Sequence, residues 1–278
     1  MILNWVTFIY FASFVLYLFR LITGKKFWGC AASFLVWTGF IAQTIALLQR
    51  WKTSYDLGMG HVPLANLYES MVFFAWAIIL IYLIIEWRTK NKIFGVFVVP
   101  VAFLAMAYAS IGKDIDNRIE PLIPALQSNW LTIHVVTCFM GYAAFAVAFG
   151  CGLIYLLKNT GKGNAEKPAG FSGKLPALTT LDTLIYQSIT LGFVFLTIGI
   201  MTGSIWAHYA WGSYWSWDPK ETWSLITWLI YAIMLHSRYV RGWRGKRMAI
   251  LALIGFACVL FTYLGVNYLP GLHSYLRS

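Results

Sequence analysis

The chain has 278 residues, of which 60% are hydrophobic and only 11% are charged, and its mean hydropathy is positive. Soluble domains carry about a quarter of charged residues, so this composition excludes a soluble fold and predicts an integral membrane protein. The formal net charge of +11 could serve binding to nucleic acid, but the placement of the cations along the chain favours a membrane topology instead.

Apolar runs of about 20 residues, the length needed for a membrane-spanning helix, recur along the chain. The predicted spans cover residues 3–22, 27–49, 66–87, 93–112, 130–157, 181–207, 223–237 and 248–269. The sequence therefore predicts an all-α, polytopic membrane protein with about eight transmembrane helices. Residues 1–278 are expected to form a single membrane domain.

The cations indicate the orientation of these spans. Most of them fall in alternate loops, at Arg20, Lys25, Lys26, Arg88, Lys90, Lys92, Lys158, Lys162, Lys167, Lys174, Arg238, Arg241, Arg244, Lys246 and Arg247. By the positive-inside rule these loops face the cytoplasm, which places both termini outside (N-out, C-out). No cation precedes the first apolar run, so we expect it to remain as a membrane helix and not as a cleaved signal peptide.

The cysteines do not indicate a redox or zinc site. Cys30, Cys138, Cys151 and Cys258 all fall inside predicted spans, and no C-x-x-C pair occurs. A thiol-disulfide centre or a structural zinc site would need such pairs outside the apolar runs. We interpret the four thiols as small apolar side chains in packed helices.

Residues 205–223, IWAHYAWGSYWSWDPKETW, form a tryptophan-rich segment on the predicted outer side. Its aromatic residues could form an interfacial belt, or they could form a wall for a flat conjugated ligand. Asp218, Pro219 and Glu221 have the pattern of an N-cap, an N1 proline and a capping box, which predicts a helix starting at about Pro219. Trp211 and Trp215 would share one face if that part is helical, and Gly212 between them would leave room for close approach.

The order W-G-x-x-W-x-W-D-P-K-E-T-W, from Trp211 to Trp223, closely resembles the WWD signature of membrane proteins that handle haem during cytochrome c maturation. Its W-D-P-K-E-T-W part is most similar to the CcsA (ResC-type) branch, the haem-handling subunit of the System II cytochrome c synthase. The resemblance covers nearly the whole chain, with a domain core at about 66–278 and an external WWD loop at about 205–223. It includes His134 in a W-L-x-x-H-V context and a terminal G-L-H.

The resemblance implies a haem site on the outer side. His134 and His273 would be the two axial ligands of a transiently and non-covalently bound haem b, since two neutral imidazoles suit a six-coordinate haem iron. Taken singly, each of these histidines could equally be an interfacial residue. The cofactor-binding residues of the segment would be Trp211, Gly212, Trp215, Trp217 and Asp218.

A third histidine is implied to serve an earlier haem site within the membrane. His236 lies about thirteen residues into the span at 223–237, so at ~1.5 Å per residue it is ~20 Å deep. It could also extend toward the membrane surface beside Arg238. No second histidine occurs at that depth, and the resemblance implies that a CcsB-type membrane partner supplies the other ligand. The roles of His61 and His208 are left open.

The resemblance implies that the chain moves haem b to the outer face and presents it for thioether attachment to the C-x-x-C-H motif of apocytochrome c. It would act within a holocytochrome c synthase complex that depends on the CcsB-type partner, with thiol-reducing proteins acting indirectly. No catalytic general acid or base is identifiable. The expected location is the bacterial cytoplasmic (inner) membrane with the active face on the periplasmic side, or a thylakoid membrane for a plastid protein.

Three other functions fit parts of the sequence. The first is System I-like delivery of haem to a haem chaperone, and the second is haem export without attachment. The third is an electron-transfer membrane cytochrome, which requires two pairs of histidines at two depths, whereas the chain offers one external pair and one single histidine.

Overall fold

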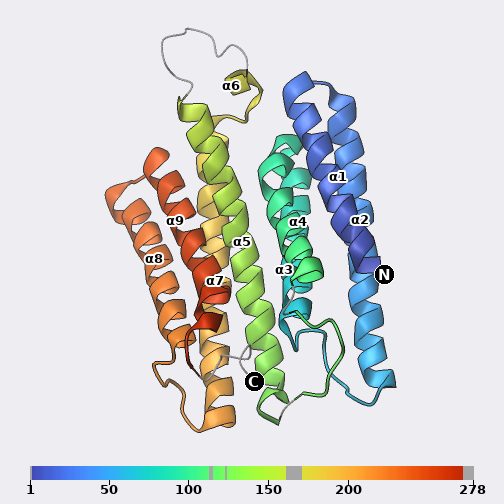
Figure 1. The fold of residues 1–278 in the computed structure, drawn as a ribbon. Helices are drawn as coiled ribbons and strands as arrows, with labels where there is room; N and C mark the ends of the chain where they lie inside the picture. Colours follow the sequence, from blue (N-terminus) through green and yellow to red (C-terminus); the bar gives the residue numbers. More distant parts are fainter. Residues whose placement is uncertain (1, 113–114, 123, 161–170, 272–278) are drawn as a thin grey trace.

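The computed structural model describes residues 2–112, 115–122, 124–160 and 171–271. These residues form a bundle of long helices that run roughly along one direction (Figure 1). The α-helices are α1 (Ile2–Thr23), α2 (Lys26–Asp56), α3 (Leu67–Thr89), α4 (Gly95–Ile111), α5 (Asn129–Thr160), α6 (Phe171–Lys174), α7 (Leu178–Trp211), α8 (Pro219–Arg241) and α9 (Lys246–Tyr263). Three short 3-10 turns are η1 (Lys92–Phe94), η2 (Pro124–Leu126) and η3 (Gly265–Tyr268). The predicted all-α fold is confirmed, and the described residues contain no strand.

Within the described ranges, seven helical stretches are long and apolar enough to cross a membrane: α1, α2, α3, η1 with α4, α5, α7 and α9 with η3. This confirms a polytopic membrane protein. The exception among the predicted spans is α8, which is 23 residues long but less apolar, because charged residues occupy both of its ends and His236 and Ser237 shorten its apolar run. The count of eight spans and the N-out, C-out orientation stay predictions.

Helix α5 lies at the centre of the bundle. Figure 1 shows α1 to α4 on one side of α5, and α8 and α9 on the other. The most extensive helix contact in the bundle is between α5 and α7. In the buried core, the rings of Phe145 (α5) and Tyr231 (α8) stack with centroids 3.5 Å apart and an interplanar angle of 4°. α5 thus joins the N-terminal and C-terminal helices into one packed body.

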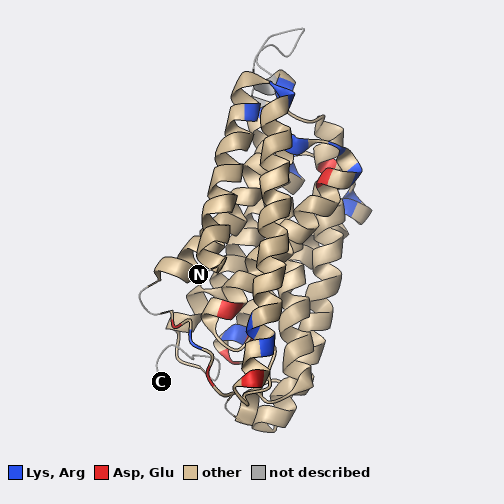
Figure 2. Cartoon of the chain, turned by 90° about the vertical axis from the view of Figure 1, so that its right-hand side faces the viewer, with Lys and Arg blue, Asp and Glu red and all other residues tan. Residues whose placement is uncertain are grey.

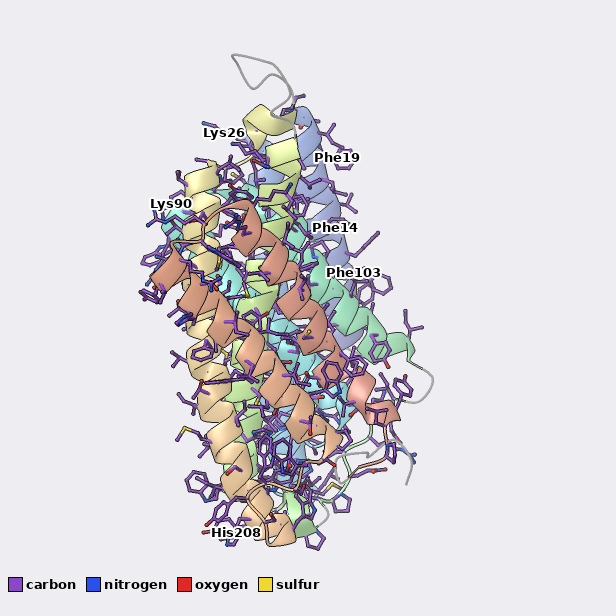
Figure 3. The ribbon with its side chains drawn as sticks, turned by 90° about the vertical axis from the view of Figure 1, so that its left-hand side faces the viewer. Phe14, Phe19, Lys26, Lys90, Phe103 and His208 are labelled. Carbon is purple, nitrogen blue, oxygen red and sulfur yellow. The ribbon has the colours of Figure 1, made fainter. Side chains whose placement is uncertain are left out.

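The two ends of the bundle differ in charge. Lys26 and Lys90 lie at one end and His208 lies at the other (Figure 3). Figure 2 shows many Lys and Arg toward the first end with some acidic residues among them, whereas toward the second end Asp and Glu lie beside a few cations. The predicted cation-rich loops therefore share one end, and the tryptophan-rich segment lies at the opposite end.

Candidate functional site

A cavity of about 500 Å³ lies at the end of the bundle that carries the tryptophan-rich segment. The first turns of α3, α5 and α8 meet the last turns of α7 and α9 around it. Its volume falls within the range of about 300–1,000 Å³ that is typical of small-molecule sites. The lining includes His134, Cys138, Gly203, Trp206, Trp215 and Lys220.

His134 lies in the wall of this cavity, one turn after Trp130 in α5. Its Nδ1 lies 2.6 Å from the carbonyl oxygen of Gly199 in α7. A carbonyl can only accept, so Nδ1 carries a proton and donates it; in the neutral form of the ring, Nε2 is then the basic nitrogen. A backbone carbonyl that fixes the tautomer in this way is the usual support of a metal-binding histidine. The ring also stacks on Trp206, with centroids 6.1 Å apart and an interplanar angle of 17°.

Gly203 of α7 provides the space for this imidazole. A Cβ atom at position 203 would lie 2.4 Å from Nδ1 of His134. That is far closer than two such atoms can approach, so any larger residue would push the ring away from Gly199. The pattern of the sequence did not single out Gly203, because its role depends on the close contact between α5 and α7.

The tryptophan-rich segment is not one continuous structure. α7 continues to Trp211 and ends at Gly212, which has a left-handed backbone (φ 77°) and donates its N–H to the backbone carbonyl of His208 at 2.8 Å. The loop itself therefore comprises residues 212–218, and the condition under which Trp211 and Trp215 would share a helix face is not met, because Trp215 is not helical. The left-handed backbone conformation of Gly212 ends the helix, which is a role that glycine fills most readily. The predicted role of Gly212 in ligand binding stays a prediction.

The predicted start of α8 is confirmed. The Asp218 carboxylate accepts from the Lys220 N–H at 2.9 Å, and the Glu221 carboxylate accepts from the Asp218 N–H at 3.2 Å, as in a capping box. Glu221 has a second role that the sequence did not reveal. The backbone N–H and the hydroxyl of Ser216 also donate to its Oε2, at 2.7 and 3.1 Å. This one carboxylate therefore fixes the loop as well as the helix start.

The tryptophans of the segment differ in their positions. Trp206 and Trp215 line the cavity, and the Trp206 indole donates to the carbonyl of Ala125 at 2.8 Å. Trp211 packs on Trp206 with ring centroids 4.8 Å apart, so it supports the wall from behind. Trp217 is 69% exposed and does not line the cavity. Trp206 was missed from the sequence because it precedes the W-G-x-x-W pattern.

Two polar groups stand out in the wall. The Lys220 ammonium donates to Oδ1 of Asn267 at 3.1 Å, and burial lowers the pKa of Lys220 to about 8. Nε1 of Trp215 is enclosed by protein and has no acceptor among the described residues. At the rim, Arg118 lies 2.7 Å from Asp116 and holds the pKa of that carboxyl below its usual value.

The other predicted iron ligands are not brought to His134 by the described residues. His236 is exposed on α8, sixteen positions after Lys220, which at ~1.5 Å per residue separates the two by ~24 Å along the helix. His236 is therefore not part of the cavity. His273 lies outside the described residues.

The two remaining histidines do not line the cavity, and each contacts a neighbouring part of the protein. His61 is buried, and its ring nitrogens each lie 3.0 Å from a carbonyl oxygen, that of Val62 for Nδ1 and that of Glu120 for Nε2. It thereby ties the loop before α3 to the loop before α5. His208 is exposed and stacks on Tyr214, with centroids 4.2 Å apart and an interplanar angle of 5°.

Comparison with known proteins identifies the family. The family model described as "Cytochrome C assembly protein" matches residues 64–273, which include all the elements around the cavity. Several relatives carry the name "Cytochrome c biogenesis protein CcsA". The protein of Pyropia yezoensis is 41% identical over 271 residues, covering 84% of this chain and 83% of the relative. The protein of Synechococcus sp. (strain CC9902) is 39% identical over 299 residues, covering 97% and 96%.

A third relative, from Chlamydomonas reinhardtii, is 45% identical over 238 residues and is matched over 64% of its own length. All three matches extend over more than four-fifths of this chain. The chain therefore belongs to the cytochrome c assembly protein family, as a CcsA-type membrane protein with a role in cytochrome c biogenesis.

Proposed function

We propose that this chain is the haem-handling subunit of a System II cytochrome c synthase. It binds haem b in the cavity, at the outer face of a bacterial cytoplasmic membrane or of a thylakoid membrane, and presents it to apocytochrome c together with a CcsB-type partner. The observation that carries the proposal is His134, an imidazole in the wall of an aromatic cavity whose Nδ1 bonds to the carbonyl of Gly199.

The residues of the cavity fit a haem. Neutral imidazole is a common ligand of haem iron, and the flat apolar macrocycle suits the indole rings of Trp206 and Trp215. His273 is the proposed second ligand. The described chain ends at Gly271, where a Cβ atom would lie 2.5 Å from the Asp218 carboxylate.

The protein's contribution to attachment is chiefly positioning. The two thiols of a C-x-x-C-H motif add across the two vinyl groups of the haem. Each addition forms one C–S bond, and the thiol proton ends on the neighbouring vinyl carbon. Holding the vinyl groups against the thiols turns a dilute encounter into an effectively unimolecular step. No side chain of this chain is assigned as a general acid or base.

His236 is proposed as a ligand of an earlier haem site within the membrane. Its side chain is exposed on α8, at a position that a second membrane subunit can contact. The exposed position supports a ligand pair shared with the CcsB-type partner. An electron-transfer cytochrome would need both histidines of each pair. The chain offers only His236 at this depth, so that function has less support.

The proposal is tested by an attachment assay. The chain and its CcsB-type partner are co-expressed in cells without their own synthase, with an apocytochrome that carries either C-x-x-C-H or S-x-x-S-H. We expect covalent haem on denaturing gels only with the thiol-containing motif. Haem bound to the complex without attachment to C-x-x-C-H would contradict synthase activity and favour haem export, and transfer to a haem chaperone would favour the System I-like function.

A second prediction concerns Gly203. In the Gly203→Ala variant the imidazole of His134 loses its bond to Gly199, so we expect haem affinity to fall by about 10- to 100-fold, as when the support of a metal ligand is removed. Affinity is measured by titrating haem into the detergent-purified chain and following the Soret band. In a His134→Gly background, Gly203→Ala should have no further effect. An additional loss in that background would mean that Gly203 acts independently of His134.

A further inference from the structure

We propose that Lys220 and Trp215 form the site that receives a carboxylate of the bound tetrapyrrole and thereby sets its orientation in the cavity. This inference rests on the proposed function. Haem carries two propionate groups on one edge and its vinyl groups toward the opposite edge, so a fixed propionate determines where the vinyl groups point.

Lys220 supplies the charge. Of the Lys and Arg side chains in the described part of the chain, it is the one that lines the cavity. Its Nζ donates to a neutral amide oxygen, that of Asn267, and the Asn267 amide nitrogen in turn donates to the Tyr263 carbonyl at 3.0 Å. An ammonium has three N–H donors and no acceptor, so one bond to Asn267 leaves capacity for an anion.

Lys220 does not form a salt bridge with a carboxylate in the described structure. The neighbouring Asp218 binds the backbone N–H of Lys220 as a helix cap. Asp218 also attracts the ammonium electrostatically, but burial outweighs this attraction, and a carboxylate ligand would offset the remaining cost of desolvation. The cation is therefore placed where an incoming anion gains the most.

Trp215 supplies a second donor. Its Nε1–H is shielded from solvent and has no acceptor among the described residues, although a buried indole N–H usually finds one. Trp215 also lines the cavity. An indole nitrogen can only donate, so the group it requires is an acceptor such as a carboxylate oxygen. Two donor-only groups among the lining residues distinguish this cavity from a purely apolar one.

The acidic groups of the cavity have partners of their own. Asp116 pairs with Arg118, and Glu221 accepts from the backbone N–H groups of the loop and the helix start. The remaining carboxylate, Glu120, lies in the loop before α5 and interacts electrostatically with Arg118. The carboxylates that line the cavity therefore have a cation or N–H donors beside them, so an anionic edge of a ligand is favoured beside Lys220 and Trp215.

The test compares iron protoporphyrin IX with its dimethyl ester, which has the same iron and vinyl groups but no carboxylates. Each compound is titrated into the full-length, detergent-purified chain as wild type, Lys220→Met, Lys220→Arg and Trp215→Phe. His134→Gly is titrated in parallel to subtract partition into micelles. We expect the wild type to bind the free acid at least about tenfold more tightly than the ester.

Lys220→Met should bind both compounds equally, with its affinity for the ester unchanged. Lys220→Arg should retain part of the preference, and Trp215→Phe should reduce it. Equal affinity of the wild type for the two compounds, or a preference that survives in Lys220→Met, would overturn the inference while leaving haem binding intact. If neither compound gives a spectrum that depends on His134, the proposed function itself fails, and this inference fails with it.

Discussion

Replacement of His134 by glycine is expected to abolish the low-spin haem spectrum of the purified protein. The substitution removes the one imidazole of the described chain that lines the cavity, and it leaves the space of the ring empty. Loss of groups that only support a metal ligand costs about 10- to 100-fold in affinity, so loss of the ligand itself should cost more than about 100-fold. Added imidazole should enter the vacated space and restore the low-spin spectrum.

His208→Gly is the matched control for this experiment. His208 lies at the same end of the bundle, but it is exposed and stacks on Tyr214 instead of lining the cavity. We expect the His208→Gly spectrum to match the wild type. A His134→Gly protein that keeps a low-spin spectrum without imidazole would show that the axial ligands lie elsewhere.

The second large effect is expected at a buried ion pair beside the cavity. Nε of Arg50 in α2 lies 2.6 Å from Oε1 of Glu69 in α3, and the Glu69 side chain is 1% exposed. Arg50→Met would leave a buried carboxylate without its cation, which typically costs about 3–5 kcal/mol. We expect a clear fall in the apparent unfolding temperature of the detergent-purified chain.

Glu69→Gln in the Arg50→Met background should recover much of this stability. The amide oxygen of Gln can still accept from the backbone N–H of Ala65, which donates to Glu69 at 2.7 Å. Arg50 also donates to the carbonyl of Arg118, as does Asn66, so the pair helps to hold the loop before α5 at the rim. If Arg50→Met unfolds at the wild-type temperature, the pair does not stabilise this end of the bundle.

Most of the fold could be predicted from the sequence because the thickness of a bilayer fixes the length of an apolar helix. Several helix ends could not be predicted. α2 continues past the predicted residue 49 to Asp56, and α7 continues past residue 207 to Trp211. Polar and aromatic residues extend these helices beyond the apolar run, and the end of α7 is decided by the left-handed backbone of Gly212.

The candidate site could be predicted where its chemistry is local. The cap formed by Asp218 and Glu221 is encoded within four residues, and it is present as predicted. Gly203, Trp206 and Lys220 were not singled out, because their roles depend on which helices meet. Gly203 makes room for the His134 imidazole because α7 packs on α5. Lys220 lines the cavity because α8 begins beside the end of α9, where Lys220 bonds to Asn267.

The proposed haem site is tested most directly by a cryo-electron microscopy map of the full chain with the proposed CcsB-type partner, purified with haem bound. The account predicts a macrocycle in the cavity beside Trp206 and Trp215, with its iron bound to Nε2 of His134 and the Nδ1–H of that ring still donated to Gly199. A macrocycle outside this cavity, or an iron without His134 as a ligand, would contradict it.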